Sequence, residues 1–190
     1  MAVSFALMTR ASPRLVARAQ SLRLHLPVRI PAPRHLGTAS SLVSLAVAVV
    51  LVAAGFVGSR DPLANPLPLF VWTVWWIGLS YLHAAFGNLW THLNPWSGLH
   101  RVVTARAPLR RWRDSPPLSY PRWAAEWPAV AGLLLFAWFE LIHPAPTDPA
   151  ILATAVAGYL LAHLAGGLLF GPQWLRRAET FTVFFRMISG

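Results

Sequence analysis

The sequence predicts an all-α membrane protein, a polytopic transmembrane helix bundle with about four spanning helices. Apolar residues make up 56% of its 190 residues and charged residues only 12%, whereas soluble domains carry about 25% charged residues. A soluble fold of this size could not cover so much apolar surface. A backbone in lipid must satisfy its own hydrogen bonds, so each long apolar stretch is expected to be a helix.

The four predicted spans each contain about 20 residues, which at a rise of 1.5 Å per residue match a hydrocarbon core of about 30 Å. They cover 39–58, 67–87, 124–142 and 150–171. Ser-Arg-Asp-Pro at 59–62 separates the first two, because charge and proline together break an apolar helix.

Basic segments surround this membrane domain. Residues 1–38 contain six arginines and no acidic residue, which suits a poorly ordered cytoplasmic arm or, alternatively, an organelle transit peptide. A basic loop, 88–123, joins the second and third spans, and a basic amphipathic tail covers 172–190.

The distribution of arginine predicts the topology. With the N-terminus in the cytoplasm, fifteen of the sixteen arginines face the cytoplasm and only Arg60 lies outside, as the positive-inside rule requires. We therefore expect a bacterial inner-membrane protein with both termini cytoplasmic.

The net charge of +10 also predicts partners. The arginines flank apolar runs and are expected to contact the lipid bilayer and its anionic headgroups. No nucleic acid is expected as a partner, because no nucleic-acid-binding motif accompanies the arginines. The absence of cysteine excludes disulfides, thiolate metal sites and cysteine nucleophiles.

Ionisable side chains within spans are candidates for function because their burial in lipid is costly. His83 and His163 should lie at similar depth in the cytoplasmic half, with Tyr159 and Ser80 on the same helical faces. Such a pocket could bind a divalent metal through His83 and His163, or transfer a proton. The alternative is hydrogen bonding between helices, worth about 0.6 kcal/mol per pair.

A second polar group lies near the outer end of the third span. Glu140 and His143 have the E-x-x-H spacing of bundle di-metal proteins, but the chain has six acidic residues and no second such motif. We expect buried Glu140 instead to pair with Arg60 or with helix ends.

Small residues on the fourth span, Gly158, Ala162 and Gly166, predict close packing against another helix of the bundle or of a second subunit.

The segment 87–96 follows the second span and contains Asn88, His92, Asn94 and Trp96. These side chains are candidates for the mouth of the His83 site. The alternative is an interfacial elbow, since Asn-Pro alone explains a turn.

Hydrolase motifs such as G-x-S-x-G and H-E-x-x-H are absent. Six short motifs nevertheless carry a family resemblance: DPLANPLP at 61–68, FGNLW at 86–90, LNPW at 93–96, WPA at 127–129, WFEL at 138–141 and ETFTVFF at 179–185. Together they resemble bacterial integral membrane proteins of the fenitrothion hydrolase family. The resemblance runs from about residue 42 to 188, and family members are longer, with further membrane segments.

Two function classes follow. The resemblance implies a hydrolase of small organophosphorus triesters, with His83, His163 and Tyr159 as candidate catalytic residues. The alternative is a non-enzymatic membrane subunit for assembly, transport or ion handling, in which the same polar groups serve packing or permeation.

Overall fold

The computed structural model describes residues 34–106 and 108–189. All described secondary structure is helical, without a strand in that part of the chain, which confirms the all-α class. Most of the predicted arm lies outside the described residues. Its last residues, from Arg34 on, already belong to the first described helix, α3, which spans Arg34–Val57.

Three helical segments are long and apolar enough to cross a membrane: Leu36–Val57, Pro66–Phe86 and Pro149–Phe170. The first lies in α3 and the third is helix α10, Pro149–Phe170. The second joins α4 (Pro66–Leu69), the π-helix η1 (Phe70–Gly78) and α5 (Leu79–Phe86). These three agree with the predicted spans to within a few residues, except that α3 begins earlier.

The remaining predicted span, 124–142, is shorter than expected. Helix α9 covers Trp127–Leu141, 15 residues, or about 22 Å at the rise of an α-helix. Before it, Arg122–Ala124 forms a 3-10 turn and Ala125 adopts a φ of 41°. This left-handed conformation interrupts the helix, because it is unfavourable for residues with a Cβ.

The three long helices keep most of their apolar surface on the outside. At most 28% of the apolar window of each is buried within the chain. On these helices, large side chains such as Val50 and Leu161 are about two-thirds exposed, and so is Leu134 of the shorter α9. A surface of this kind is costly in water and favourable in lipid, which supports membrane association.

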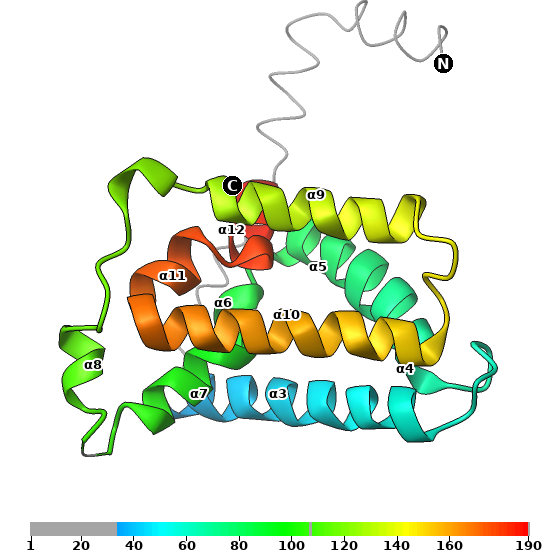
Figure 1. Cartoon of the computed structure of the whole chain (residues 1–190), viewed down its shortest axis with the longest axis horizontal. Helices are drawn as coiled ribbons and strands as arrows, with labels where there is room; N and C mark the ends of the chain where they lie inside the picture. The colour runs from blue at the N-terminus through cyan, green and yellow to red at the C-terminus, as the bar shows by residue number, and fades with distance from the viewer. Residues whose placement is uncertain (1–33, 107, 190) are drawn as a thin grey trace, which may run out of the picture. The chain divides into compact units, whose positions relative to one another are not determined.

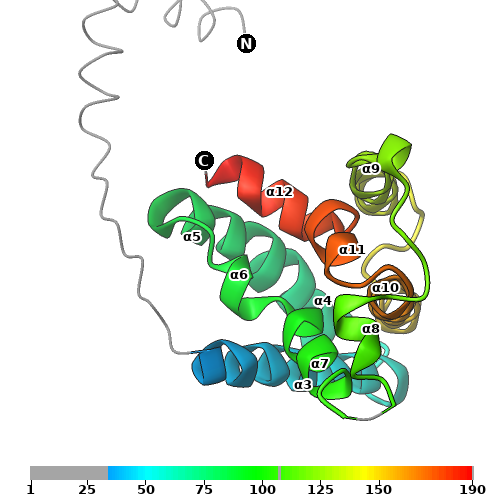
Figure 2. The ribbon, with the colours of Figure 1, turned by 90° about the vertical axis from the view of Figure 1, so that its left-hand side faces the viewer.

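Figures 1 and 2 show how the helices are arranged. Helices α9 and α10 run antiparallel, and α3 lies against α10 and against α7, Pro95–Val103. The short helix α6, Trp90–Leu93, connects the second candidate span to α7. The last helix, α12 (Thr180–Ile188), packs against α9, α5 and α6.

The π-helix η1 is the least expected element. The N–H of Leu79 bonds to the carbonyl of Val74, five residues earlier, and such helices are rare and usually short. It carries three tryptophans, of which Trp75 meets Phe181 of α12 edge-on at 4.2 Å between ring centroids. The widened turn thus lies where the second candidate span contacts α12.

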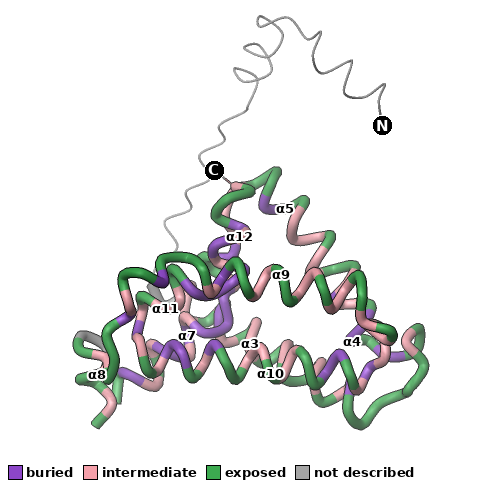
Figure 3. Tube along the Cα trace, turned by 45° about the horizontal axis from the view of Figure 1, so that its top comes forward, coloured by how far each residue is buried: buried purple, intermediate pink, exposed green. Residues whose placement is uncertain are grey.

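The C-terminal segment turns back along α10. Gly171 has a φ of 67°, and after it α11 (Pro172–Arg177) begins. Trp174 packs on Gly166, so closely that any side chain at position 166 would collide with its ring. Helix α12 then buries its apolar face, including Phe181 and Phe185. The predicted tail is therefore part of the bundle, and Figure 3 shows buried residues gathered along α12.

Candidate functional site

The candidate site is a buried polar cluster around Glu179, the N-cap of α12. Glu179 is fully buried, and its side-chain carboxylate accepts six hydrogen bonds from described residues. Two of these bonds come from the backbone N–H groups of Phe181 and Thr182, at 3.1 and 2.7 Å, which cap the helix.

The other four bonds come from side chains on three parts of the fold. Trp90 Nε1 and Asn94 Nδ2 donate to Oε2 at 2.9 and 3.1 Å. The Thr182 hydroxyl also donates to Oε2, and the Tyr159 hydroxyl donates to Oε1. One carboxylate thus links the α6–α7 elbow, the middle of α10 and the start of α12.

Asn94 is the second junction of this cluster. Its side-chain oxygen accepts from the backbone N–H groups of Trp96 and Ser97 and so caps α7. Its backbone oxygen accepts from the Ser41 hydroxyl of α3 at 2.5 Å. Because Pro95 occupies the first position of α7, the Asn-Pro pair starts the helix while the Asn94 amide remains directed at Glu179.

An aromatic wall covers one side of the cluster. The Tyr159 and His163 rings lie 4.3 Å apart between centroids, and Trp96 packs edge-on against both. His163 Nδ1 accepts from Trp174 Nε1 at 3.1 Å. Two of the predicted catalytic residues, Tyr159 and His163, therefore do lie together.

His83 belongs to a different set of contacts. Its Nδ1 lies 2.6 Å from the Leu79 carbonyl, and its Nε2 accepts from the Trp90 backbone N–H at 2.9 Å, so Nδ1 carries the proton. The ring stacks on Phe185 at 3.9 Å between centroids. Both nitrogens are therefore engaged in holding α5, α6 and α12 together, and within the described chain no ring contact or hydrogen bond connects His83 with His163.

The other predicted pocket and mouth residues separate in the structure. Asn94 and Trp96 are buried in the cluster, whereas His92 is exposed and Asn88 half-buried. The Ser80 hydroxyl of α5 donates to the Trp76 carbonyl of η1, one turn earlier in the same candidate span, at 2.6 Å. Segment 87–96 is thus an elbow that reaches the buried polar groups through Trp90, Asn94 and Trp96 and not through Asn88 or His92.

At the outer end of the bundle, Arg60 does not form the expected pair with Glu140. Arg60 lies 4.0 Å from Asp148, the N-cap of α10, and not beside Glu140. Glu140 is half-buried, and its carboxylate makes no hydrogen bond or ion pair to another described residue.

The predicted small-residue stripe on α10 is divided between two environments. Gly166 contacts Trp174 of α11, so this part of the stripe packs within the chain. Gly158 and Ala162 are exposed, and a Cβ at Gly158 would meet no atom within 4 Å.

Metal ligands do not converge in the described residues, where no group of three or more His, Asp or Glu side chains could hold an ion. The chemistry of the Glu179 cluster is that of a carboxylate held by neutral donors. Its donors are indole, amide, hydroxyl and backbone N–H groups, and no arginine is bonded to it in this part of the chain.

The sequence prediction missed Glu179. Glu179 lies among the basic residues Arg176, Arg177 and Arg186, and the sequence therefore predicted that it belongs to a cytoplasmic tail. A usable signal was present: Glu179 is the single acidic residue after Asp148, and it precedes the amphipathic run Thr-Phe-Thr-Val-Phe-Phe. An acid just before such a run favours a helix start there, because negative charge is stabilised at a helix N-terminus.

Comparisons of the chain with protein-family models, with curated proteins and with solved structures found no match.

Proposed function

We propose that this chain is a non-enzymatic integral membrane subunit of the assembly, transport or ion-handling class. The observation that carries the proposal is the hydrogen bonding of Glu179. Its carboxylate takes donors from α6, α10 and α12 and from the Asn94 elbow, so it serves to connect helices. A carboxylate within a membrane domain is costly unless it is compensated in this way.

His83 supports the same proposal. Its two ring nitrogens bond to Leu79 and Trp90, which leaves neither nitrogen to act as a base or a ligand while the fold is intact. The exposed apolar surface of the long helices is where this subunit would contact lipid or a partner helix, including the face of Gly158 and Ala162.

A phosphotriester hydrolase is the second candidate, supported by one specific observation. The motifs that carry the family resemblance supply Trp90, Asn94, Trp96 and Glu179, and these four residues belong to one cluster. In that case Glu179, Tyr159 and His163 would form the reacting centre.

Hydrolysis of a chromogenic organophosphorus triester separates the two candidates. Purified protein would be assayed with and without a chelator, together with His163→Ala and Glu179→Gln and the matched control Glu140→Gln. The first proposal expects no turnover in any preparation. Turnover that Glu140→Gln retains and the two cluster variants lose would overturn it in favour of the hydrolase.

For location we propose the bacterial inner membrane with both termini in the cytoplasm, supported by the arginines on the loop and tail. The arginines would then lie beside the anionic headgroups of the inner leaflet. Because the chain has no cysteine, single introduced cysteines can report sidedness. Exposed Ser115→Cys should react with a membrane-impermeant maleimide only after cell lysis, and exposed Ala64→Cys in intact spheroplasts.

A further inference from the structure

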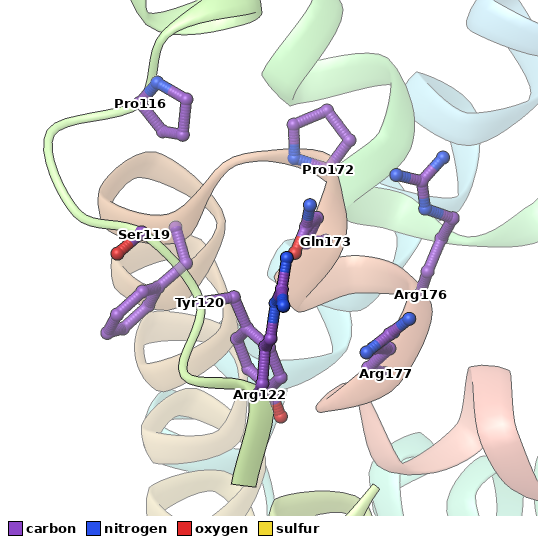
Figure 4. A pocket seen from close by; sticks show the side chains of 9 residues that line it. Pro116, Ser119, Tyr120, Arg122, Pro172, Gln173, Arg176 and Arg177 are labelled. Carbon is purple, nitrogen blue, oxygen red and sulfur yellow. The ribbon is translucent and has the colours of Figure 1, made fainter. Parts of the chain in front are cut away.

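A pocket outside the Glu179 cluster lies where α10 ends and α11 begins. Its volume is about 780 Å³, within the range of about 300–1,000 Å³ of small-molecule sites. Three arginines line it, Arg122 from the loop before α9 and Arg176 and Arg177 from α11, as Figure 4 shows. Its remaining lining includes Ser119, Tyr120 and Gln173 and no acidic residue.

The wall of this pocket is fixed to the end of α10. The Leu118 backbone N–H donates to the Leu169 carbonyl at 2.9 Å, satisfying a carbonyl that the helix end leaves free. Pro116 lies beside Gly171, where an added Cβ would come within 3.2 Å of the proline ring. Tyr120 donates its hydroxyl to the Ala125 carbonyl at 2.8 Å. The loop is therefore held in place before any ligand arrives.

The three arginines are not neutralised within the described chain. Its ion pairs are Arg60 with Asp148 and Arg186 with Glu126, so the nearby Glu126 is already engaged. Burial raises the pKa of Tyr120, and the positive charge of Arg177 partly opposes this rise, which is consistent with Arg177 lying close to the phenol. The three arginines are exposed, so solvent screens part of their mutual repulsion, and an anion between them would relieve the rest.

We propose that this pocket binds the phosphate group of an anionic phosphate ester. Guanidinium groups donate paired hydrogen bonds that match phosphate oxygens, and Ser119 and Gln173 add neutral polar groups. A phosphotriester is neutral and would not balance the arginines, so the site is independent of both candidate functions given above.

The position of the pocket bears on the source of the phosphate. Phe170, the last residue of the candidate span α10, and Pro172, the first of α11, both line it. The end of a span lies at the level of the lipid headgroups. A phospholipid headgroup and a soluble phosphate ester would both present the same phosphate group to the arginines. The experiment therefore includes a competitor of each kind.

The test uses the full chain in neutral detergent and a dansyl-labelled phosphatidic acid, with energy transfer from the protein's tryptophans as the signal. The variant R122Q/R176Q/R177Q removes the pocket charges. The matched control R106Q/R110Q/R111Q removes three exposed charges from the basic loop outside the pocket lining. Far-UV circular dichroism checks that both variants keep their helices, and R122Q alone provides a milder change.

We expect the pocket variant to bind at least about tenfold more weakly, which is the contribution of about one charged hydrogen bond, and R122Q to be intermediate. The control should stay within about twofold. Competition by glycerol phosphate would assign the site to soluble esters, and competition by unlabelled phosphatidic acid alone would assign it to lipid. Equal loss in both triple variants, or no loss in either, would overturn the proposal.

Discussion

Replacing Glu179 by alanine tests the role of the buried carboxylate. The substitution leaves five donors without their acceptor: Trp90 Nε1, the hydroxyls of Tyr159 and Thr182, and the backbone N–H groups of Phe181 and Thr182. Asn94 keeps a bond to the Thr182 hydroxyl at 3.0 Å, so its loss is smaller.

The magnitude follows from these donors. At about 1 kcal/mol for each unpaired donor, Glu179→Ala should lower the free energy of unfolding by about 5 kcal/mol. Glu179→Gln should cost about half as much, since its amide oxygen can serve the Trp90 and Asn94 side while its NH₂ group faces the Phe181 N–H.

The assay is unfolding in a mild detergent titrated with a denaturing one, followed by tryptophan fluorescence. Glu140→Ala is the control, because it removes the same group from a half-buried residue without a described partner, and its effect should stay below about 0.5 kcal/mol. A Glu179→Ala protein as stable as the Glu140→Ala protein would refute the reasoning.

Further substitutions test the bonds of His83, the turn at Gly171 and the proposed topology. His83→Ala should cost about 2–3 kcal/mol in the same assay, because the Trp90 N–H loses its acceptor and Phe185 its stacked ring; no destabilisation would contradict the assigned bonds. Gly171→Ala should cost about 1–2 kcal/mol because φ is 67° and Pro116 is close, whereas Gly158→Ala should be neutral. Labelling of Ser115→Cys in intact spheroplasts would contradict the proposed topology.

The helices could be predicted from the sequence because each one depends on a local pattern of apolar residues. Long uncharged apolar runs predicted α3, the second candidate span and α10. Most of the predicted ends lie within a few residues of the observed ones. The third predicted span was too long at its start. Pro128, in the first turn of α9, was the available signal for a helix start near Trp127, because proline is favoured there.

Only part of the candidate site could be predicted from the sequence. Tyr159 and His163 share a helical face, and that spacing alone brought them together. Glu179 joins them because α11 turns back along α10, a tertiary event that depends on Gly171 and on Trp174 packing against Gly166. Counting helical rise along straight helices predicted that His83 lies at the depth of His163. In the structure, contacts with Phe185 and Trp90 determine where the His83 ring lies.

The central claim is that the C-terminal segment folds back into the bundle and brings Glu179 inside it. The most direct test is a disulfide between Gly132→Cys of α9 and Thr180→Cys of α12, introduced into the cysteine-free chain. A Cβ at Gly132 would lie 3.4 Å from the Thr180 Cβ, close to the separation of about 3.5–4.5 Å in disulfides.

Mild oxidation followed by alkylation and intact-mass measurement reports the bond. We predict that the Gly132→Cys/Thr180→Cys pair resists alkylation after oxidation and that the Gly158→Cys/Thr180→Cys pair does not, because position 158 faces outward. Complete alkylation of the first pair, or equal protection of both pairs, would contradict the claim.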